Sequence, residues 1–195
     1  CSRILGMKPD TTLSDYIGGK GSPVQARDLL DLLAGSKALG AFSQIQPERR
    51  HRREMILSEA LEGLNDYQYV ILDTPPGFSD LSVNVLFYAD SVIIPVSMEV
   101  LAVEGLFNLR EELEEIQRYK PIEIRAIVPT FVDGRVGKTE TILGQLREAF
   151  GKVVTLPIHY STRFSELPAW GQTIYEYDPK GRGSIDYAKV AGAIA

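Results

Sequence analysis

The hydrophobic positions of the chain fall into two kinds of stretch. Short runs that are apolar almost throughout are typical of strands covered on both faces of a sheet, and they lie at 69–72, 91–96, 124–128 and 153–156. Longer stretches repeat apolar residues at intervals of three and four, which predicts helices over 23–34, 48–64, 80–89, 101–119 and 139–150, and from Gly183 onward.

Strands that alternate with helices in this way predict an α/β fold, with a doubly wound, mostly parallel sheet and helices on both of its faces. Right-handed crossovers then bring the carboxyl ends of the strands to one edge of the sheet, where ligands bind. Asp73, Thr130 and the segment 157–160 closely follow three of these strands. We therefore expect them at that edge.

The composition fits one globular domain over residues 1–195, since hydrophobic residues make up 44% of the chain and charged residues 24%. The net charge of −5 argues against a protein that is basic over its whole surface, although one positive face remains compatible with it. The single cysteine, Cys1, excludes an internal disulfide and fits a reducing cytosol. No apolar run approaches the roughly 20 residues of a membrane-spanning helix.

Asp73 is the first candidate for chemistry. It ends the run 69–72 and precedes Thr-Pro-Pro-Gly, which in a nucleotide-binding sheet places a carboxylate beside a Mg²⁺-bound water and the β- and γ-phosphates. Pro75 and Pro76 would then begin a switch segment that senses the γ-phosphate. The alternative is an aspartate that only caps the next turn, but the apolar run before it favours the metal-binding hypothesis.

A second candidate fails on its spacing. Residues 133–139 end in Gly-Lys-Thr, but a phosphate-binding loop needs a glycine at the position of Val132. The compact variant of that loop would need lysine and glycine where Asp133 and Arg135 stand, and a carboxylate there would repel phosphate. We therefore interpret Lys138 as part of an ordinary loop before a helix.

The segment 156–168 follows the last strand and carries prolines and aromatic residues. Such a loop can form a slot for a base through apolar contacts and backbone hydrogen bonds, and ordinary loop packing is the equal alternative. His159 has only one other histidine in the chain, His51, and no cysteine or carboxylate at ligand spacing. We therefore expect neither a metal site nor a catalytic triad at His159.

Two groups of basic residues are candidates for DNA contact. Either group could bind phosphates without reading sequence, or could form a solvated face of a helix, which is the commoner role of such runs. The groups are Arg49, Arg50, Arg52 and Arg53, and Arg163, Lys180, Arg182 and Lys189.

Seven segments, taken in order, resemble the ParA/MinD family of deviant-Walker ATPases, and most closely its Soj-type ParA branch. They include Tyr-Val-Ile-Leu-Asp-Thr-Pro-Pro-Gly at 69–77 and Gly-Gln-Thr-Ile-Tyr-Glu-Tyr-Asp-Pro at 171–179. The other segments are 1–7, 89–96, 99–106, 162–168 and 181–183. The series spans nearly the whole chain and is far more specific than any one motif.

By this resemblance the intact protein is a P-loop ATPase that uses ATP and Mg²⁺, dimerises on ATP binding and binds nucleoid DNA non-specifically in the cytoplasm. A ParB-like centromere-binding partner would stimulate it to segregate a chromosome or plasmid. Asp73 would be the catalytic, Mg²⁺-holding carboxylate of Walker B. The implied nucleotide-binding residues are Asp73, Pro75, Pro76, Thr130, Ile158, His159 and Tyr160, and the DNA-binding ones are Arg163, Lys180 and Arg182. Family members often have proline and arginine at the positions of His159 and Tyr160.

The resemblance further implies a βα unit with the phosphate-binding loop, and one more strand, upstream of Cys1. On this hypothesis the chain is an N-terminally truncated fragment, and we expect it not to hydrolyse ATP by itself. Three alternatives stay open: a catalytically inactive interaction module of the same fold, a MinD-like positioning ATPase, and a metabolic relative in which ATP activates a carboxylate.

Overall fold

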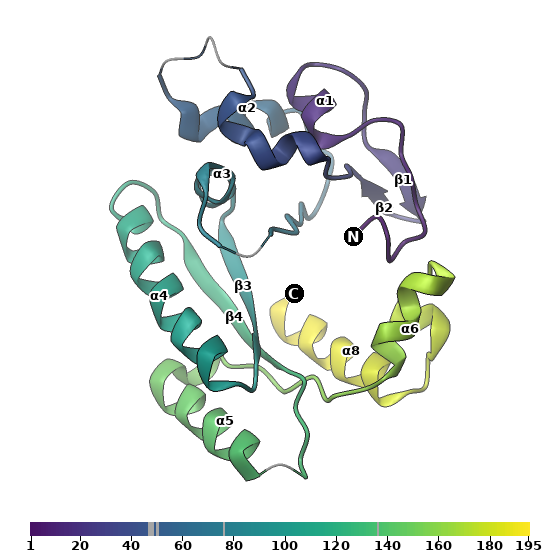
Figure 1. The fold of residues 1–195 in the computed structure, drawn as a ribbon, viewed down its shortest axis with the longest axis vertical. Helices are drawn as coiled ribbons and strands as arrows, with labels where there is room; N and C mark the ends of the chain where they lie inside the picture. The colour runs from purple at the N-terminus through teal and green to yellow at the C-terminus, as the bar shows by residue number, and fades with distance from the viewer. Residues whose placement is uncertain (47–48, 50, 76, 136) are drawn as a thin grey trace. The chain divides into compact units, whose positions relative to one another are not determined.

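The structure, a computed structural model, describes residues 1–195 except 47–48, 50, 76 and 136. Its contacts divide the chain into two compact units, Cys1–Ala89 and Asp90–Ala195 (Figure 1). Whether residues 1–195 form a single domain therefore stays a prediction.

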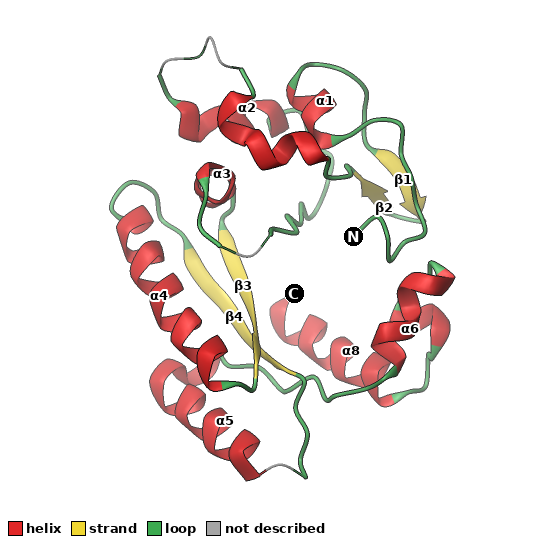
Figure 2. Cartoon of the chain, in the orientation of Figure 1, coloured by secondary structure: helices red, strands yellow, loops and turns green. Residues whose placement is uncertain are grey.

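The first unit combines short helices with one hairpin (Figure 2). Thr12 begins the first helix with a capping box, because its side chain accepts a hydrogen bond from the Asp15 N–H while the Asp15 carboxylate accepts one from the Thr12 N–H at 2.9 Å. The elements in chain order are α1 (Leu13–Ile17), β1 (Val24–Arg27), β2 (Leu30–Leu32), η1 (Lys37–Gln44), η2 (Arg53–Met55), α2 (Ile56–Leu61) and α3 (Asp80–Tyr88).

Residues 23–34 contain the β1–β2 hairpin, so the helix predicted there is wrong. The two strands are antiparallel, with Arg27 opposite Leu30. Leu29, in the connecting turn, has a φ of 59° and is fully exposed, whereas a helix would have turned it toward a core. Over so short a stretch the same apolar residues suit either structure, and the turn decides between them.

The helix predicted over 48–64 is much shorter in the structure, where η2 and α2 together cover only Arg53–Met55 and Ile56–Leu61. The helix predicted over 80–89 is confirmed as α3. A buried hydrogen bond joins α2 to α3, since the Leu57 N–H donates to Asn84 Oδ1 at 3.1 Å. The core of the unit consists of Ile17, Phe42, Ile56, Leu57 and Leu61.

The run 69–72, predicted as a buried strand, is not a strand. The described residues from 68 to 75 have no regular secondary structure beyond a bend at Gln68, and Tyr69 and Ile71 are 63% and 85% exposed. A strand forms only where a neighbour can pair with its backbone groups. In the described part of the first unit, the regular strands are those of the β1–β2 hairpin, so this run has no neighbouring strand.

The second unit begins with a βαβ motif. β3 (Ser91–Ser97) and β4 (Glu123–Thr130) pair in parallel and are joined by α4 (Val100–Gln117). This confirms the strands predicted at 91–96 and 124–128 and the helix predicted at 101–119. The remaining elements are α5 (Gly137–Phe150), η3 (Gly151–Val153), α6 (Arg163–Trp170), α7 (Ile174–Tyr177) and α8 (Arg182–Ile194).

The strand predicted at 153–156 is present only as an irregular segment beside β4. A single parallel bridge joins Val154 to Ile127, and the Ile158 N–H donates to the Pro129 carbonyl at 2.8 Å. Pro157 has no N–H to contribute between these two points, which prevents a regular ladder.

Helices cover both faces of the β3–β4 pair. Ala126 and Val128 of β4 pack with Val190 of α8, while Ile127, fully buried, points to the opposite face because side chains alternate along a strand. In Figure 1, α4 and α5 lie on one side of the strands and α8 on the other. The fold is therefore α/β with a parallel sheet, as predicted. Within the described residues, no helix is both long enough and apolar enough to span a membrane.

Candidate nucleotide site

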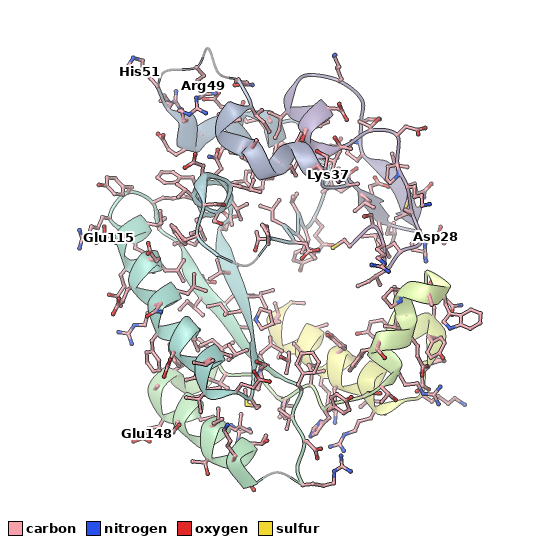
Figure 3. The ribbon with its side chains drawn as sticks, viewed as in Figure 1. Asp28, Lys37, Arg49, His51, Glu115 and Glu148 are labelled. Carbon is pink, nitrogen blue, oxygen red and sulfur yellow. The ribbon has the colours of Figure 1, made fainter. Side chains whose placement is uncertain are left out.

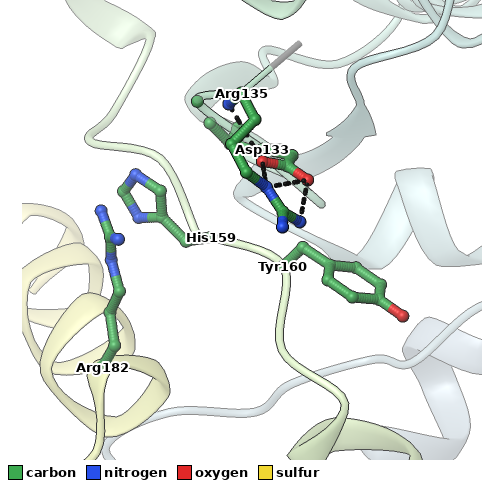
Figure 4. A pocket seen from close by; sticks show the side chains of 7 residues that line it. Asp133, Arg135, His159, Tyr160 and Arg182 are labelled. Atoms are coloured by element: carbon green, nitrogen blue, oxygen red, sulfur yellow. Dashed lines mark hydrogen bonds and ion pairs between the residues drawn. The ribbon is translucent and has the colours of Figure 1, made fainter.

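A cavity of about 340 Å³ lies just beyond the carboxyl end of β4 (Figure 4). Two chain segments meet there, because the Val132 N–H donates to the Ile158 carbonyl at 3.2 Å and the Tyr160 N–H donates to the Val132 carbonyl at 3.0 Å. This is the edge at which parallel α/β sheets bind ligands. The lining residues are Val132, Asp133, Gly134, Arg135, His159, Tyr160 and Arg182.

A turn at the end of β4 directs the chain along this cavity. Phe131 follows the strand with a φ of 54°, a conformation that is uncommon for a bulky residue. Its ring lies 6.5 Å from that of Tyr160, measured between centroids. Figure 4 shows the side chains of His159 and Tyr160 on opposite sides of their extended segment, with Arg182 on the side of His159.

His159 is held by a buried carboxylate. Its Nδ1 lies 2.8 Å from Asp186 Oδ2, and its backbone N–H donates to the same oxygen at 3.1 Å. Asp186 is buried on α8, and Arg182 Nε lies 4.0 Å from that oxygen, one helical turn earlier. Two hydrogen bonds of His159, one from its backbone and one from its ring, thus meet on the same oxygen of the buried Asp186. Together they fix the imidazole in one orientation.

Asp133 and Arg135 close a second ion pair at the cavity. Arg135 Nη2 lies 2.7 Å from Asp133 Oδ2, and the Arg135 N–H donates to Asp133 Oδ1 at 3.0 Å. The hydrogen bonds from the Arg135 side chain, and then from its backbone, lower the pKa of Asp133 to about 2. The carboxylate therefore stays ionised at neutral pH, and this loop presents an ion pair rather than a phosphate-binding cradle.

The structure brings only some of the predicted nucleotide-binding residues to the cavity. His159 and Tyr160 line the cavity, and Arg182, predicted for DNA, lines it with them. Thr130 ends β4 opposite Ser97. The Ile158 side chain is 2% exposed and packs in the core with Val190, so only its backbone reaches this edge.

The sequence patterns did not predict Asp133 and Arg135, which line the cavity, or Asp186, which contacts His159, as site residues. In the sequence, Asp133 and Arg135 only marked departures from a phosphate-binding loop. Arg182 and Asp186 stand four apart on one helix, which is a detectable spacing. No sequence signal connects His159 with Asp186, because 27 residues separate them.

Asp73 lies in the first unit, and its side chain is 63% exposed. Its Oδ2 accepts a hydrogen bond from Cys1 Sγ at 3.0 Å. Pro75 is exposed, and Pro76 lies outside the described residues. Among the residues that the structure describes, no cluster of three or more His, Cys, Asp or Glu side chains could hold a metal ion. The metal-binding role of Asp73 stays a prediction.

The basic residues that are predicted to contact DNA differ in whether an acidic side chain lies beside them. Arg163 Nε lies 3.8 Å from Asp178 Oδ2, whereas Lys180 is exposed and has no recorded ion pair within the described residues. Arg49, close to His51 in Figure 3, donates two hydrogen bonds to Glu59, at 2.6 and 2.8 Å. Arg50 lies outside the described residues. The 49–53 group is thus partly neutralised.

Comparison with known proteins identifies the family. A family model described as an AAA domain (AAA_31) matches residues 13–126. The chain is 34% identical to the chromosome partitioning protein ParA of Caulobacter vibrioides over 98% of this chain and 76% of that protein. The chain belongs to the ParA family. It is also 34% identical to the sporulation initiation inhibitor protein Soj of Bacillus subtilis, over 73% of this chain and 58% of that one.

Solved structures agree with this ParA-family fold. A Cyanothece McdA(D38A)–ATP complex matches with a TM-score of 0.78 at 20% identity, over 98% of this chain and 80% of that one. The cobyrinic acid a,c-diamide synthase of Mycobacterium smegmatis, with bound ADP and magnesium, matches with a TM-score of 0.77 at 23% identity, over 96% and 74%. These identities establish the P-loop ATPase fold alone, so the second match does not favour the metabolic alternative.

Proposed function

We propose that the protein is an ATP-driven partitioning switch. It binds ATP and Mg²⁺, dimerises when ATP is bound, and binds nucleoid DNA non-specifically in the cytoplasm. A ParB-like partner stimulates its ATP hydrolysis. The observation that carries this proposal is the 34% identity to a chromosome partitioning ParA over 98% of the chain.

The size and the lining of the cavity suit the base of a nucleotide. Its volume of about 340 Å³ lies within the roughly 300–1,000 Å³ of small-molecule sites. His159 supplies a ring for a base, and Arg182, on the same side of the segment, supplies positive charge. We place the base beside His159.

The side chain of Asp73 is of a kind that can serve Mg²⁺. Its exposed carboxylate is the oxygen ligand that Mg²⁺ prefers in proteins, and it would hold a metal-bound water. When bound with ATP, Mg²⁺ would neutralise charge on the β- and γ-phosphates. The part of Asp73 is to keep that water in place.

The experiment is a comparison of nucleotide states in the full-length protein. DNA binding and sedimentation are measured with ATP, with ADP and without nucleotide, and Mg²⁺-dependent ATP hydrolysis with and without a ParB-like partner. We expect a dimer and DNA binding only with ATP, and faster hydrolysis with the partner. Absence of both hydrolysis and ATP-dependent DNA binding would favour the inactive module, and ATP-dependent vesicle binding a MinD-like protein.

Lys180→Gln tests the DNA surface. The variant should weaken DNA binding to a similar extent for all sequences, and the slope of log K against log salt concentration should fall by about 1, because one phosphate contact is lost. Lys180 is preferred to Arg182, which lines the cavity and lies near Asp186.

Lys37→Gln is the matched control, since it removes one charge from an exposed lysine of the first unit. Its affinity and salt slope should equal those of the unchanged protein. Gel shifts at four salt concentrations measure both quantities. Equal slopes for Lys180→Gln and the unchanged protein would remove Lys180 from the DNA surface.

A further inference from the structure

The hydrogen bond between His159 and Asp186 determines which imidazole nitrogen carries the proton. An ionised carboxylate only accepts hydrogen bonds, so the Nδ1 that lies 2.8 Å from Asp186 Oδ2 must donate. In a neutral imidazole the other nitrogen is then an acceptor. Asp186 thereby makes Nε2 of His159 a hydrogen-bond acceptor.

The charged groups around the cavity are paired with one another. Asp133 is paired with Arg135, and Asp186 faces Arg182. These two pairs contain the charged residues that line the cavity or contact His159.

Nε2 is available to a ligand. The His159 side chain is 23% exposed and lines the cavity, and no partner of Nε2 is recorded among the described residues. The backbone bond from His159 to Asp186 prevents the segment from moving away from α8. The cavity thus presents one oriented acceptor to a base.

We propose that His159 is a specificity-determining residue, whose Nε2 accepts a hydrogen bond from the 6-amino group of adenine and discriminates against a 6-oxo purine. Asp186 is its positioning residue. This inference rests on the proposed nucleotide function and adds the group that recognises the base.

The chemistry of position 6 accounts for the discrimination. An amino group donates to Nε2, whereas a carbonyl oxygen would place two acceptors against each other and leave both unpaired. The net difference for one such hydrogen bond corresponds to about a 10-fold change in affinity. Sites that bind a donor group of the ligand reject analogues that lack it for this reason.

The test compares ATP with inosine triphosphate, which has an oxygen in place of the 6-amino group. Equilibrium binding to the full-length protein with Mg²⁺ should favour ATP about 10-fold. His159→Phe keeps a ring but has no acceptor, so the preference should fall to nearly 1. His159→Gln can place an amide oxygen near the position of Nε2, so this variant should keep part of the preference for ATP.

Three further variants separate the recognition from general effects. His51→Phe, at the other histidine, should leave the ATP preference unchanged. In Asp186→Asn the amide oxygen can still accept from the His159 backbone N–H and from Nδ1–H, so the ATP preference should be kept, whereas Asp186→Ala removes this acceptor and should lower the preference. If Asp186 only stabilised the fold, Asp186→Ala would weaken the binding of both nucleotides equally.

The outcomes distinguish this inference from the proposed function. Equal binding of ATP and inosine triphosphate by the unchanged protein, or an unchanged preference in His159→Phe, would overturn the role of His159 while leaving the partitioning ATPase in place. Failure of the protein to bind any nucleoside triphosphate would overturn both.

Discussion

Replacing Asp73 with alanine is expected to lower Mg²⁺-dependent ATP hydrolysis by about 10- to 100-fold, the usual effect of losing a group that orients a metal-bound water. The fold should be retained, because the side chain is 63% exposed and lies in a segment without regular secondary structure. Initial rates over a series of Mg²⁺ concentrations measure the effect.

Asp66→Ala is the control for this experiment, since Asp66 is an exposed aspartate seven residues earlier in the same irregular segment. It should hydrolyse ATP at the unchanged rate. Circular dichroism and thermal melting should be the same for both variants and the parent. Turnover by Asp73→Ala at the parent rate would show that Asp73 is only a surface residue of a turn.

The sequence predicted correctly those elements whose own hydrophobic pattern is enough to tell a helix from a strand. Residues 91–96 and 124–128 are apolar runs separated by a long helical stretch, and a parallel βαβ unit is the arrangement that buries all three. α4 repeats its apolar residues over five turns, so Leu106, Leu113 and Ile116 are buried on one face. Long periodic stretches leave little ambiguity.

The predictions that failed depended on neighbours. The run 69–72 has the composition of a buried strand, but composition does not supply the strand that must pair with it. Residues 23–34 carry leucines at helical spacing, but the turn at Leu29 places them on a hairpin. Periodicity over only about three helical turns does not separate the two structures.

The candidate site was predictable only in part, for the same reason. The position of His159 and Tyr160 follows from the rule that ligands bind at the carboxyl ends of parallel strands. The group that orients His159 is Asp186, which comes from the final helix. Such a pair depends on how α8 packs, and the sequence between the two residues does not specify it.

The packing of α8 also explains the glycine at position 183 and gives the second large expected effect. A Cβ at Gly183 would lie 2.8 Å from Phe164 Cζ and 3.2 Å from Ile174 Cγ1. The Phe164 ring cannot simply move away, because it packs edge-to-face on Tyr187 with centroids 5.7 Å apart. Gly183→Ala should therefore destabilise the protein by about 1–3 kcal/mol, the usual cost of overpacking.

Gly192→Ala, in the last turn of the same helix, is the matched control. A Cβ there meets nothing within 4 Å among the described residues, so alanine should stabilise the protein by about 0.5–1 kcal/mol through its lower backbone entropy in the unfolded chain. Urea unfolding of both variants at unchanged m-value measures the two free energies. Opposite signs would show that Gly183 is required for close packing of α8 against Phe164. A stabilised Gly183→Ala would mean that the ring yields, and that Asp186 and His159 are held less rigidly than the site requires.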